Sequence, residues 1–388
     1  MKLLFYQISY LDYDLKQVFK EKSIEFDTFA WKFANNNHDD AFLDWFEKNV
    51  DTRKYDALFS IDYWPLLSHV CQKNNLKYVA WSYDTPPNVV NIEETLGNTV
   101  NSVFWFDRTQ YEQYKNEGFN NVYYLPLGVN RTRLGALKVS GAEHKKYDTE
   151  VSLVGKLYDS DYSFIMSLMS NAYKDYFDTL IDTQGKLFDR YIIDDMITPA
   201  MMNEINAYIR ECHPEADFVL LKEALTYALA SEVTKRERII LLSLLGGRFE
   251  TRLYSYQDNQ IIKNIKRFPA VDYVTEMPLV FRCSKINLNP AFCMIQSGAS
   301  LRTLDIMGAG GFLLTRPQQE LIEMYKDGED MVVYRNIPDA VEKCKFYLEH
   351  DELREKIAKN GCRKTLEDNS LQDRVDTIFN VVFRKIFH

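Results

Sequence analysis

The sequence is poor in the patterns that build metal centres and disulfide frameworks. Its 388 residues include only six cysteines and six histidines, and no two cysteines form a Cys-x-x-Cys pair. The histidines are equally scattered, without a His-x-x-x-His spacing. These spacings favour neither a zinc site nor a set of disulfides, and buried, reduced thiols are the expected state of the cysteines.

Long apolar runs and an excess of basic residues are also missing. The longest uncharged apolar run, residues 239–247, is far shorter than the ~20 residues of a membrane helix. The 47 Lys and Arg are outnumbered by 56 Asp and Glu, which argues against a nucleic-acid partner. Residues 1–5 lead directly into polar Gln7 and Ser9, without the pattern of a signal peptide. We therefore expect a cytoplasmic protein with no transmembrane segment and no nucleic-acid partner.

A glycine-rich dinucleotide motif is absent as well. The first predicted strand is followed by Gln7-Ile8-Ser9-Tyr10, and no Gly-x-Gly-x-x-Gly follows the first strand of either half. This absence makes an NAD- or nucleotide-using oxidoreductase or epimerase the least favoured function.

The sequence does contain the apolar residues for large cores. Hydrophobic residues make up 46% of the chain, with 25 Tyr, 24 Phe and 5 Trp, and 388 residues are enough for two domains. In residues 1–130, short apolar runs alternate with amphipathic stretches. This alternation predicts a parallel sheet with helices on both faces, which binds ligands beyond the carboxyl ends of its strands. The predicted strands are residues 2–7, 57–61, 77–81, 103–106 and 122–125, and the predicted helices are residues 14–22, 65–74 and 108–117.

A second unit with the same alternation follows. The pattern breaks at residues 135–148, which we interpret as a linker, and residues 160–235 have a helical period that predicts an insertion. The insertion could form part of an acceptor site or a homodimer contact. We predict three parts: an N-terminal Rossmann-like domain (1–145), a C-terminal domain with the insertion (146–370), and a terminal helix (371–388) that could pack back on the first domain.

Residues 297–315 are the most informative stretch. Ser297, Gly298 and Ser300 form a small, flexible approach to a predicted helix, whose first N–H groups and partial positive charge favour a phosphate. Arg302 lies in the first turn, and Asp305 lies three residues later on the same face. A guanidinium there can bind a diphosphate, and the carboxylate can accept hydrogen bonds from ribose hydroxyls. The alternative is a capped helix with an exposed Arg–Asp pair.

This stretch also carries a family resemblance. Residues 285–289 (Lys-Ile-Asn-Leu-Asn), the pair Ser297-Gly298 and residues 301–315 resemble the CgeB/YkvP-like glycosyltransferases, which are spore-coat-type proteins with a group-1 transferase domain. The resemblance covers residues 280–375 well, and weaker landmarks occur at residues 81–86, 118–130 and 152–155.

The resemblance implies a GT-B enzyme, in which two Rossmann-like domains face each other across a cleft and the second holds the donor. It implies that Gly155 and Lys156 form the first strand–loop of the donor domain, where Lys156 could contact a phosphate, although a lone Lys after a strand is more often solvated. It also implies that Val274 and Thr275 cradle the base with backbone groups. Asp305 stands where the family pattern has a ribose-binding Glu, and Ser297 stands where many group-1 enzymes have another Glu. The CgeB-like branch also lacks this second Glu.

The N-terminal half has to supply the acceptor groove. Asp84, in Trp81-Ser82-Tyr83-Asp84-Thr85-Pro86 at the end of a strand, is the leading candidate for a catalytic carboxylate, and Asp62 is the second. An inverting reaction needs such a general base, whereas a retaining reaction mainly needs positioning. A strand-end Asp before Thr-Pro-Pro could equally cap a turn.

We expect no metal and no cofactor besides the nucleotide-sugar co-substrate. The triplets 12–14 and 159–161 have the Asp-x-Asp spelling of a metal-bound diphosphate site, but such triplets arise easily among 56 acidic residues. Arg302, Lys156 and a helix N-terminus would replace the ion. The favoured function is a metal-independent glycosyltransferase with an unidentified acceptor. Its donor is expected to be a UDP-sugar, with GDP- and dTDP-sugars as alternatives. The rival function is a catalytically inactive GT-B-like binding or scaffold protein.

Overall fold

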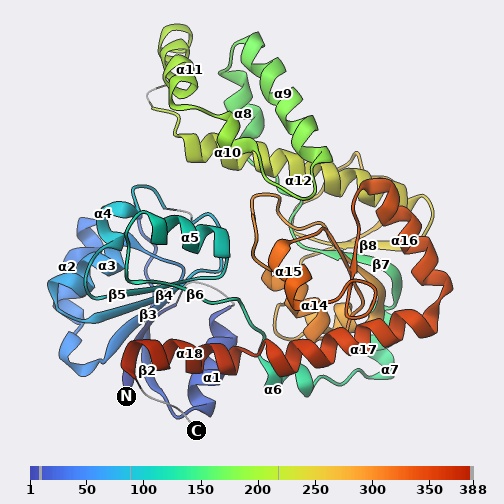
Figure 1. Cartoon of the computed structure of the whole chain (residues 1–388), viewed down its shortest axis with the longest axis horizontal. Coiled ribbons are helices and arrows are strands. Elements are labelled where there is room, and N and C mark those ends of the chain that lie inside the picture. Colours follow the sequence, from blue (N-terminus) through green and yellow to red (C-terminus); the bar gives the residue numbers. More distant parts are fainter. Residues whose placement is uncertain (8–10, 88, 217, 385–388) are drawn as a thin grey trace. The chain divides into compact units, whose positions relative to one another are not determined.

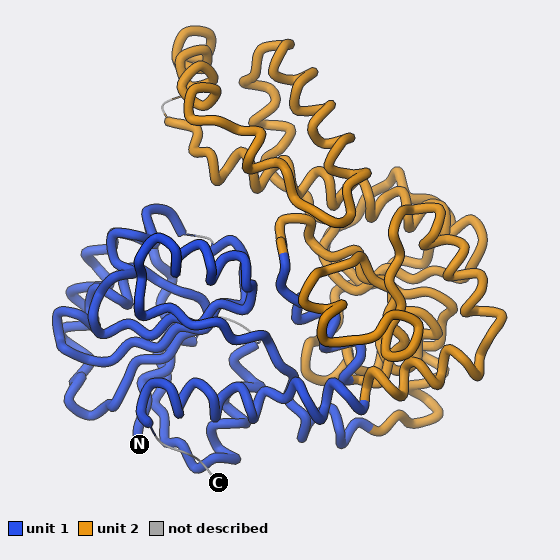
Figure 2. Tube along the Cα trace, viewed as in Figure 1, with its two compact units in different colours: residues 1–137, 297–308, 363–388 blue, residues 138–296, 309–362 orange. Residues whose placement is uncertain are grey.

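The computed structural model describes all residues except 8–10, 88, 217 and 385–388. The chain divides into two compact units, which Figure 2 shows in different colours. Unit 1 contains residues 1–137, 297–308 and 363–388, and unit 2 contains residues 138–296 and 309–362. Each unit is built on one six-stranded parallel sheet. The prediction placed the first boundary after residue 145, whereas the first segment of unit 1 ends at residue 137. The prediction also placed residues 297–308 in the second domain, whereas they belong to unit 1.

Unit 1 is a parallel sheet with helices on both faces (Figure 1). Its strands, in spatial order, are β2 (Glu25–Phe29), β1 (Lys2–Tyr6), β3 (Ala57–Ile61), β4 (Lys77–Trp81), β5 (Asn101–Trp105) and β6 (Val122–Tyr124). Its helices are α1 (Asp12–Glu21), α2 (Asp40–Asn49), the 3-10 turn η1 (Thr52–Lys54), α3 (Pro65–Lys73), α4 (Glu93–Leu96), α5 (Arg108–Asn116), α6 (Arg131–Gly135), α14 (Leu301–Gly308) and α18 (Leu371–Phe383).

Alternating side chains of the central strands fill two cores on opposite faces of this sheet. Leu4 and Leu58 point into a core formed with helices α2 to α5. Phe5 and Phe59 belong to the other face, where the ring of Phe19 in α1 lies 5.8 and 5.5 Å from theirs. Phe379 of α18 completes this aromatic cluster, 6.1 Å from Phe19. The terminal helix therefore packs on α1 and helps to cover the sheet of unit 1 (Figure 1).

Unit 2 has the same architecture. Its strands, in spatial order, are β12 (Val332–Val333), β11 (Leu313–Thr315), β10 (Ser284–Asn289), β7 (Thr149–Val154), β8 (Thr251–Tyr254) and β9 (Lys266–Phe268). Its helices are α7 (Gly141–Tyr147), α8 (Tyr162–Ser167), α9 (Asn171–Lys186), α10 (Ile193–Met196), α11 (Pro199–Cys212), α12 (Lys222–Gly246), α13 (Met277–Cys283), α15 (Gln319–Met324) and α16 (Ile337–Glu349). The chain returns to unit 1 within α17 (Asp351–Asp368).

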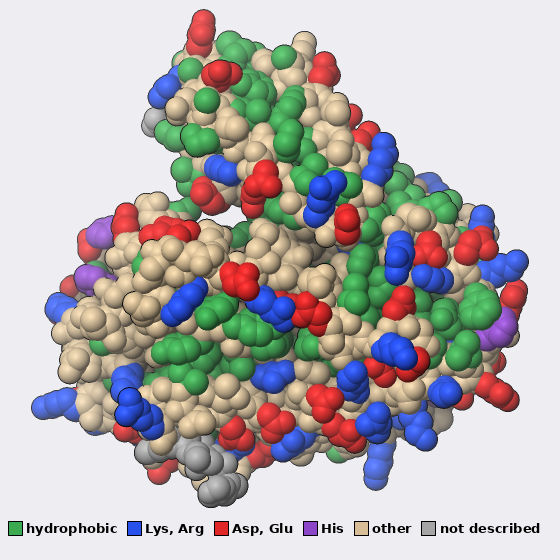
Figure 3. All heavy atoms as spheres, viewed as in Figure 1, with side chains coloured by type: hydrophobic (Ala, Val, Ile, Leu, Met, Phe, Trp, Pro, Cys, Tyr) green, Lys and Arg blue, Asp and Glu red, His purple; other side chains and the backbone are tan. Residues whose placement is uncertain are grey.

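The long helix α12 belongs to two cores. Its first half packs with α8 to α11 in an apolar cluster of the insertion, and its second half places Leu241, Leu242 and Leu245 against the strands of unit 2. A single continuous helix therefore joins the insertion to the sheet. Figure 3 shows hydrophobic side chains exposed among acidic groups over the insertion.

The structure adds elements that the sequence did not predict. The edge strands β2 and β9 were missed because their residues are mostly exposed, so they lack the apolar runs of central strands. The predicted linker at 135–148 is wrong in part, since α7 forms there, begun by a capping box between Ser140 and Glu143. The predicted terminal helix ends at Phe383, and residues 385–388 of that prediction lie outside the described residues. None of the helices in the described part of the chain is long and apolar enough to cross a membrane.

Candidate functional site

The loop before α14 is held by Asp107, the residue that precedes α5. The Asp107 carboxylate accepts hydrogen bonds from the backbone N–H groups of Ser297 and Gly298, both at 3.1 Å, and from the Ser297 hydroxyl at 2.8 Å. Ser297 Oγ in turn accepts a hydrogen bond from the backbone N–H of Thr109, at 3.1 Å in the first turn of α5. Asp107 is buried, so these bonds are shielded from water.

Gly298 allows this close approach. A Cβ atom at this position would lie 2.7 Å from the Phe106 ring and 3.1 Å from the Asp107 Cα. Only a residue without a side chain fits there without displacing the ring. The predicted glycine is therefore used for packing in the structure.

These contacts change the interpretation of Ser297 and Gly298. We expected their N–H groups to face a phosphate, but in the structure both N–H groups donate to Asp107. A buried carboxylate in unit 1 takes the position that a ligand anion was expected to take. The part of the hypothesis that used these two amides is therefore not supported by this arrangement.

Arg302 and Asp305 lie as the helical spacing predicted. The Arg302 guanidinium is 3.7 Å from the Asp305 carboxylate, and the two side chains are 24% and 8% exposed. These two side chains are therefore not the exposed Arg–Asp pair of the alternative interpretation, because the acid is buried. The pair combines a mostly buried acid with a cation that can still meet a ligand, which suits the binding of a phosphorylated sugar.

Asp62 and Asp84 come together at the carboxyl ends of neighbouring strands β3 and β4. Asp62 Oδ1 accepts hydrogen bonds from the backbone N–H groups of Tyr83 (2.7 Å) and Asp84 (3.0 Å). Burial, followed by the charge of Asp84, raises the pKa of Asp62 to about 7. Asp62 also adopts a left-handed backbone conformation with a φ of 57°, which aspartate and asparagine adopt more often than most other residues besides glycine. A carboxyl group that titrates near neutral pH is suited to proton transfer.

Tyr83 directly precedes Asp84, and its backbone N–H donates to Asp62. Burial and then the charges of nearby carboxylates raise the pKa of Tyr83 well above the usual value, so its hydroxyl stays protonated. These carboxylates are Asp14, Asp62, Asp305 and Asp12. Within unit 1, the charges of the second candidate acid, Asp62, and of the candidate donor acid, Asp305, therefore both act on the Tyr83 hydroxyl.

The other four predicted donor residues belong to unit 2. Gly155 follows β7 with a φ of 146°, a conformation that favours glycine, and the Arg238 guanidinium lies 3.4 Å from where its Cβ would stand. Arg238 Nη1 donates to the Lys156 carbonyl at 2.5 Å. The Lys156 ammonium lies 4.8 Å from the centre of the Tyr158 ring, which is a cation–π contact.

Val274 and Thr275 form a turn with Asp272. Their backbone N–H groups donate to Asp272 Oδ1 at 3.1 and 2.8 Å, and the Thr275 hydroxyl donates to the same oxygen at 2.7 Å. These N–H groups are therefore used within the turn. Unit 2 also contains a cavity of about 250 Å³ at the carboxyl ends of β8 and β9. Tyr256, Phe268 and Pro269, which are close in the sequence to residues 274 and 275, border it.

Unit 1 contains a larger cavity, of about 960 Å³. It lies at the amino ends of the strands, opposite the edge that carries Asp62 and Asp84. Lys77 and Asn101, the first residues of β4 and β5, contribute to it. Because ligands of parallel sheets bind at the carboxyl ends of strands, this hollow lies away from the chemistry described above.

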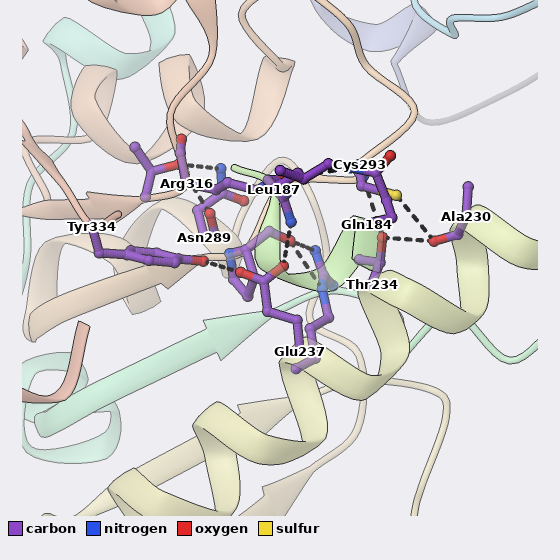
Figure 4. A network of polar contacts seen from close by, with 12 residues as sticks. Gln184, Leu187, Ala230, Thr234, Glu237, Asn289, Cys293, Arg316 and Tyr334 are labelled. Atoms are coloured by element: carbon purple, nitrogen blue, oxygen red, sulfur yellow. Dashed lines mark hydrogen bonds and ion pairs between the residues drawn. The ribbon is translucent and has the colours of Figure 1, made fainter. Parts of the chain in front are cut away.

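Unit 2 also contains a buried ionic network, drawn in Figure 4. Glu237 of α12 lies between two partners: Arg316 Nη1 donates to it at 2.7 Å, and the Tyr334 hydroxyl donates to it at 2.8 Å. The Arg316 guanidinium also donates to the Leu187 carbonyl at 2.7 Å. The side chains of Arg316 and Glu237 are only 6% and 5% exposed. This network joins α12 to the strands β11 and β12 and is a structural feature.

Among the residues that the structure describes, no group of three or more His, Cys, Asp or Glu side chains is placed to hold a metal ion. The Asp-x-Asp triplets have protein partners instead. Asp14 is paired with Arg133 at 2.5 Å, and Asp159 is paired with Lys235 at 2.7 Å.

Sequence reasoning missed Asp107 and Arg238. Asp107 was visible as a residue between a strand and a helix, which is a capping position, but nothing local indicated its bond to residues near 297. Arg238 lies in a stretch whose pattern indicates only a helix. Both residues connect segments that are distant in the sequence.

Comparisons with known proteins agree with this architecture. Residues 226–380 match a family described as glycosyl transferase-like, a range that includes Arg302 and Asp305. No curated protein sequence matches the chain. Among solved structures, the chain is similar to sucrose-phosphate synthase from Thermosynechococcus elongatus (8% identity, TM-score 0.59, 99% of this chain and 98% of that chain covered).

Two further structures are similar over the same length. One is Anabaena Alr3699/HepE in complex with UDP-glucose (11% identity, TM-score 0.53, 99% and 100% covered). The other is a protein from Listeria monocytogenes assigned as a UDP-N-acetylglucosamine 2-epimerase (8% identity, TM-score 0.50, 99% and 97% covered). At these identities the similarity establishes the fold alone. The predicted two-domain α/β GT-B fold is confirmed, and residues 226–380 are similar to the glycosyl transferase-like family.

Proposed function

We propose that this protein is a glycosyltransferase of the CgeB-like branch that moves a hexose from a nucleotide-sugar donor to a hydroxyl acceptor. The observation that carries the proposal is the glycosyl transferase-like match over residues 226–380, which contains the Arg302–Asp305 pair. The fold by itself does not separate a transferase from an epimerase, because structures assigned to both kinds of protein have it. The family match favours the transferase.

The donor is held by cations and one carboxylate. Within unit 1, Arg302 binds the diphosphate and Asp305 accepts hydrogen bonds from the ribose hydroxyls. Within unit 2, Lys156 at the carboxyl end of β7 is the candidate for a phosphate contact. Residues 274 and 275, whose N–H groups donate to Asp272, are the candidate region for the base. UDP is the first nucleotide to test, since Alr3699/HepE was solved with UDP-glucose. GDP and dTDP are the alternatives.

Asp84 is the proposed general base, with Asp62 hydrogen-bonded to its backbone N–H. In an inverting reaction, Asp84 accepts the proton of the acceptor hydroxyl as its oxygen attacks the anomeric carbon of the sugar. The bond between that carbon and the diphosphate oxygen breaks, and the diphosphate leaves with the electron pair. The charge of the leaving group is met by the Arg302 guanidinium, so the reaction requires no metal ion. Full activity in excess EDTA would support this point, and restoration of a lost activity by a divalent ion would contradict it.

The test is a screen of UDP-, GDP-, dTDP- and CDP-sugars by thermal shift and by slow donor hydrolysis. We expect one nucleotide to stabilise the protein and its sugar to be hydrolysed. Arg302→Ala should abolish donor binding and leave the fold intact, whereas Arg53→Ala, at a guanidinium whose side chain is 88% exposed, should change nothing. Asp84→Asn should keep donor binding and lower transfer by about 10²–10⁴-fold.

Three outcomes would point elsewhere. Wild-type donor affinity in Arg302→Ala would refute the site. Donor binding without turnover, even with cell extract as acceptor, would support the inactive binding protein instead. A response to NAD alone would support an oxidoreductase.

A further inference from the structure

One face of helix α12 holds the loop that follows β10. Ala230, Thr234 and Arg238 are four positions apart, so they lie along one face of the helix. The backbone N–H of Cys293 donates to Thr234 Oγ1 at 3.2 Å, and Cys293 Sγ donates to the Ala230 carbonyl at 3.3 Å (Figure 4). Arg238 Nε and Nη2 donate to the Pro290 carbonyl at 3.1 and 2.6 Å. Helix α12 therefore fixes this loop at residue 290 and again at residue 293.

Arg238 also holds the loop that follows β7. Its Nη1 donates to the Lys156 carbonyl at 2.5 Å. The three nitrogens of one planar guanidinium thus bind the carbonyl groups of two different loops, Lys156 in one and Pro290 in the other. The side chain of Arg238 is buried, so these bonds are shielded from water.

The same guanidinium contacts the β7 loop on both sides of Lys156. Before it in the sequence, a Cβ atom on Gly155 would lie 3.4 Å from Arg238 Nη1. After it, the centre of the Tyr158 ring lies 4.8 Å from the guanidinium, and this ring stacks on Phe292 with centroids 4.6 Å apart and planes at 12°. Tyr158 adopts a φ of 66°, which an aromatic residue rarely does unless its surroundings hold it there. The backbone of residues 155–158 is therefore ordered around Arg238.

The two loops lie where a parallel sheet binds its ligands. Strands β7 and β10 are paired neighbours in the centre of the sheet of unit 2, and both loops begin at the carboxyl ends of these strands. Lys156 is the candidate phosphate contact in unit 2, and the position of its side chain depends on its backbone. A backbone that is fixed before the ligand arrives reduces the entropy lost on binding.

We propose that Arg238 is a positioning residue for donor binding: it holds the loops after β7 and β10 in the arrangement in which Lys156 contacts a donor phosphate. This inference rests on the proposed function and adds a residue that acts through the backbone of the loops. It also links the donor site to the insertion, because the first half of α12 packs with α8 to α11.

The test compares donor affinity in a double-mutant cycle. Binding of the diphosphate that the protein recognises among UDP, GDP, dTDP and CDP is measured by calorimetry for wild type, Arg238→Lys, Lys156→Met and the double variant. Arg238→Lys keeps the charge but has one nitrogen in place of the three that bind the two carbonyl groups. We expect about a fivefold loss of affinity for Arg238→Lys. No further loss should follow when it is added to Lys156→Met, because the loop then carries no ammonium to position.

Two further readouts separate positioning from a loss of stability. In turnover assays of Arg238→Lys, the donor KM should rise while kcat stays unchanged. The same cycle with Arg238→Gln, a shorter and neutral donor, should give the same pattern, and it replaces Arg238→Lys if that variant does not fold.

Arg354→Lys is the matched control, because Arg354 is another buried arginine of unit 2 and donates to a backbone carbonyl, that of Tyr347, at 2.6 Å. It should lower the unfolding temperature about as much as Arg238→Lys and leave donor affinity unchanged. An equal loss of affinity in Arg354→Lys would overturn the inference, since affinity would then follow stability alone.

The remaining outcomes distinguish this inference from the proposed function. Wild-type affinity in the variants of Arg238, or an equal loss in the presence and absence of Lys156, would overturn the inference. If Arg302→Ala abolishes binding while Arg238→Lys and Arg238→Gln do not weaken it, the proposed function stands and this inference alone fails. If wild type binds none of the four diphosphates, both fail.

Discussion

The Asp107 carboxylate and the backbone N–H of Ser297 are 190 positions apart in the sequence and 3.1 Å apart in the structure. This bond, together with the one from Gly298, connects the start of α5 to the loop that leads into α14. The geometry of Arg302 and Asp305, which follow in that helix, therefore depends on a residue in another part of unit 1.

Asp107→Ala should destabilise the protein by about 3 kcal/mol. It leaves two backbone N–H groups and the Ser297 hydroxyl without their acceptor in a buried place, and it also removes the cap of α5. The measurement is urea unfolding. Ser170→Ala, which removes only the cap of α9, should cost about 1 kcal/mol. Equal losses in the two variants would show that the bonds to residues 297 and 298 contribute nothing.

Gly298→Ala should cost about 1–3 kcal/mol, because the new Cβ would lie 2.7 Å from the Phe106 ring. Gly185→Ala, in the helix α9 where no atom lies within 4 Å of a new Cβ, should instead stabilise by about 0.5–1 kcal/mol. Thermal unfolding of both variants measures the difference. Combining Phe106→Leu with Gly298→Ala in one variant should recover part of the stability that Gly298→Ala loses. The absence of any recovery would contradict the steric explanation.

Asp62→Asn should change how stability depends on pH. The pKa of Asp62 is about 7 in the folded protein against an ordinary value of 3.8, so the folded state holds this proton more tightly. The stability that this proton contributes is fully present below pH 4 and is lost as the pH rises through 7. Asparagine copies the neutral form and tolerates the left-handed backbone.

The expected size of this effect is about 1–2 kcal/mol, less than the full shift implies because Asp62 is partly exposed to solvent. The measurement is urea unfolding at several pH values between 4 and 8. Wild type should lose stability relative to Asp62→Asn over this range, whereas Asp44→Asn, on the exposed face of α2, should follow wild type. Parallel curves for wild type and Asp62→Asn would contradict the raised pKa.

Glu237→Gln should cost about 3–5 kcal/mol, because it leaves the buried Arg316 guanidinium without its countercharge. Glu367→Gln, in an exposed pair with Arg363, should cost less than about 1 kcal/mol. Replacing Glu237 and Arg316 together by Leu and Met should recover most of the loss. Chemical unfolding of the variants tests this, and a small loss in Glu237→Gln would mean that water reaches the Arg316 guanidinium.

The sequence by itself determined the elements whose signal is local. The central strands, such as residues 57–61 and 77–81, are short apolar runs between amphipathic stretches, and they were found with their observed bounds. The helical spacing of Arg302 and Asp305 is enough to place both on one face, and the two side chains do meet there. The periodicity of apolar residues is a property of a few consecutive residues, so it can be recognised without tertiary information.

Only the tertiary structure decided which distant groups meet. Asp62 lies beside Asp84 at the carboxyl edge of one sheet. The backbone N–H groups of Ser297 and Gly298 donate to Asp107. Arg238 donates to the carbonyl groups of Lys156 and Pro290, in two different loops. The tertiary structure also revealed the edge strand β2, whose exposed residues carry no apolar run. Hydrogen-bond partners depend on how the whole chain packs, and a local pattern does not contain that information.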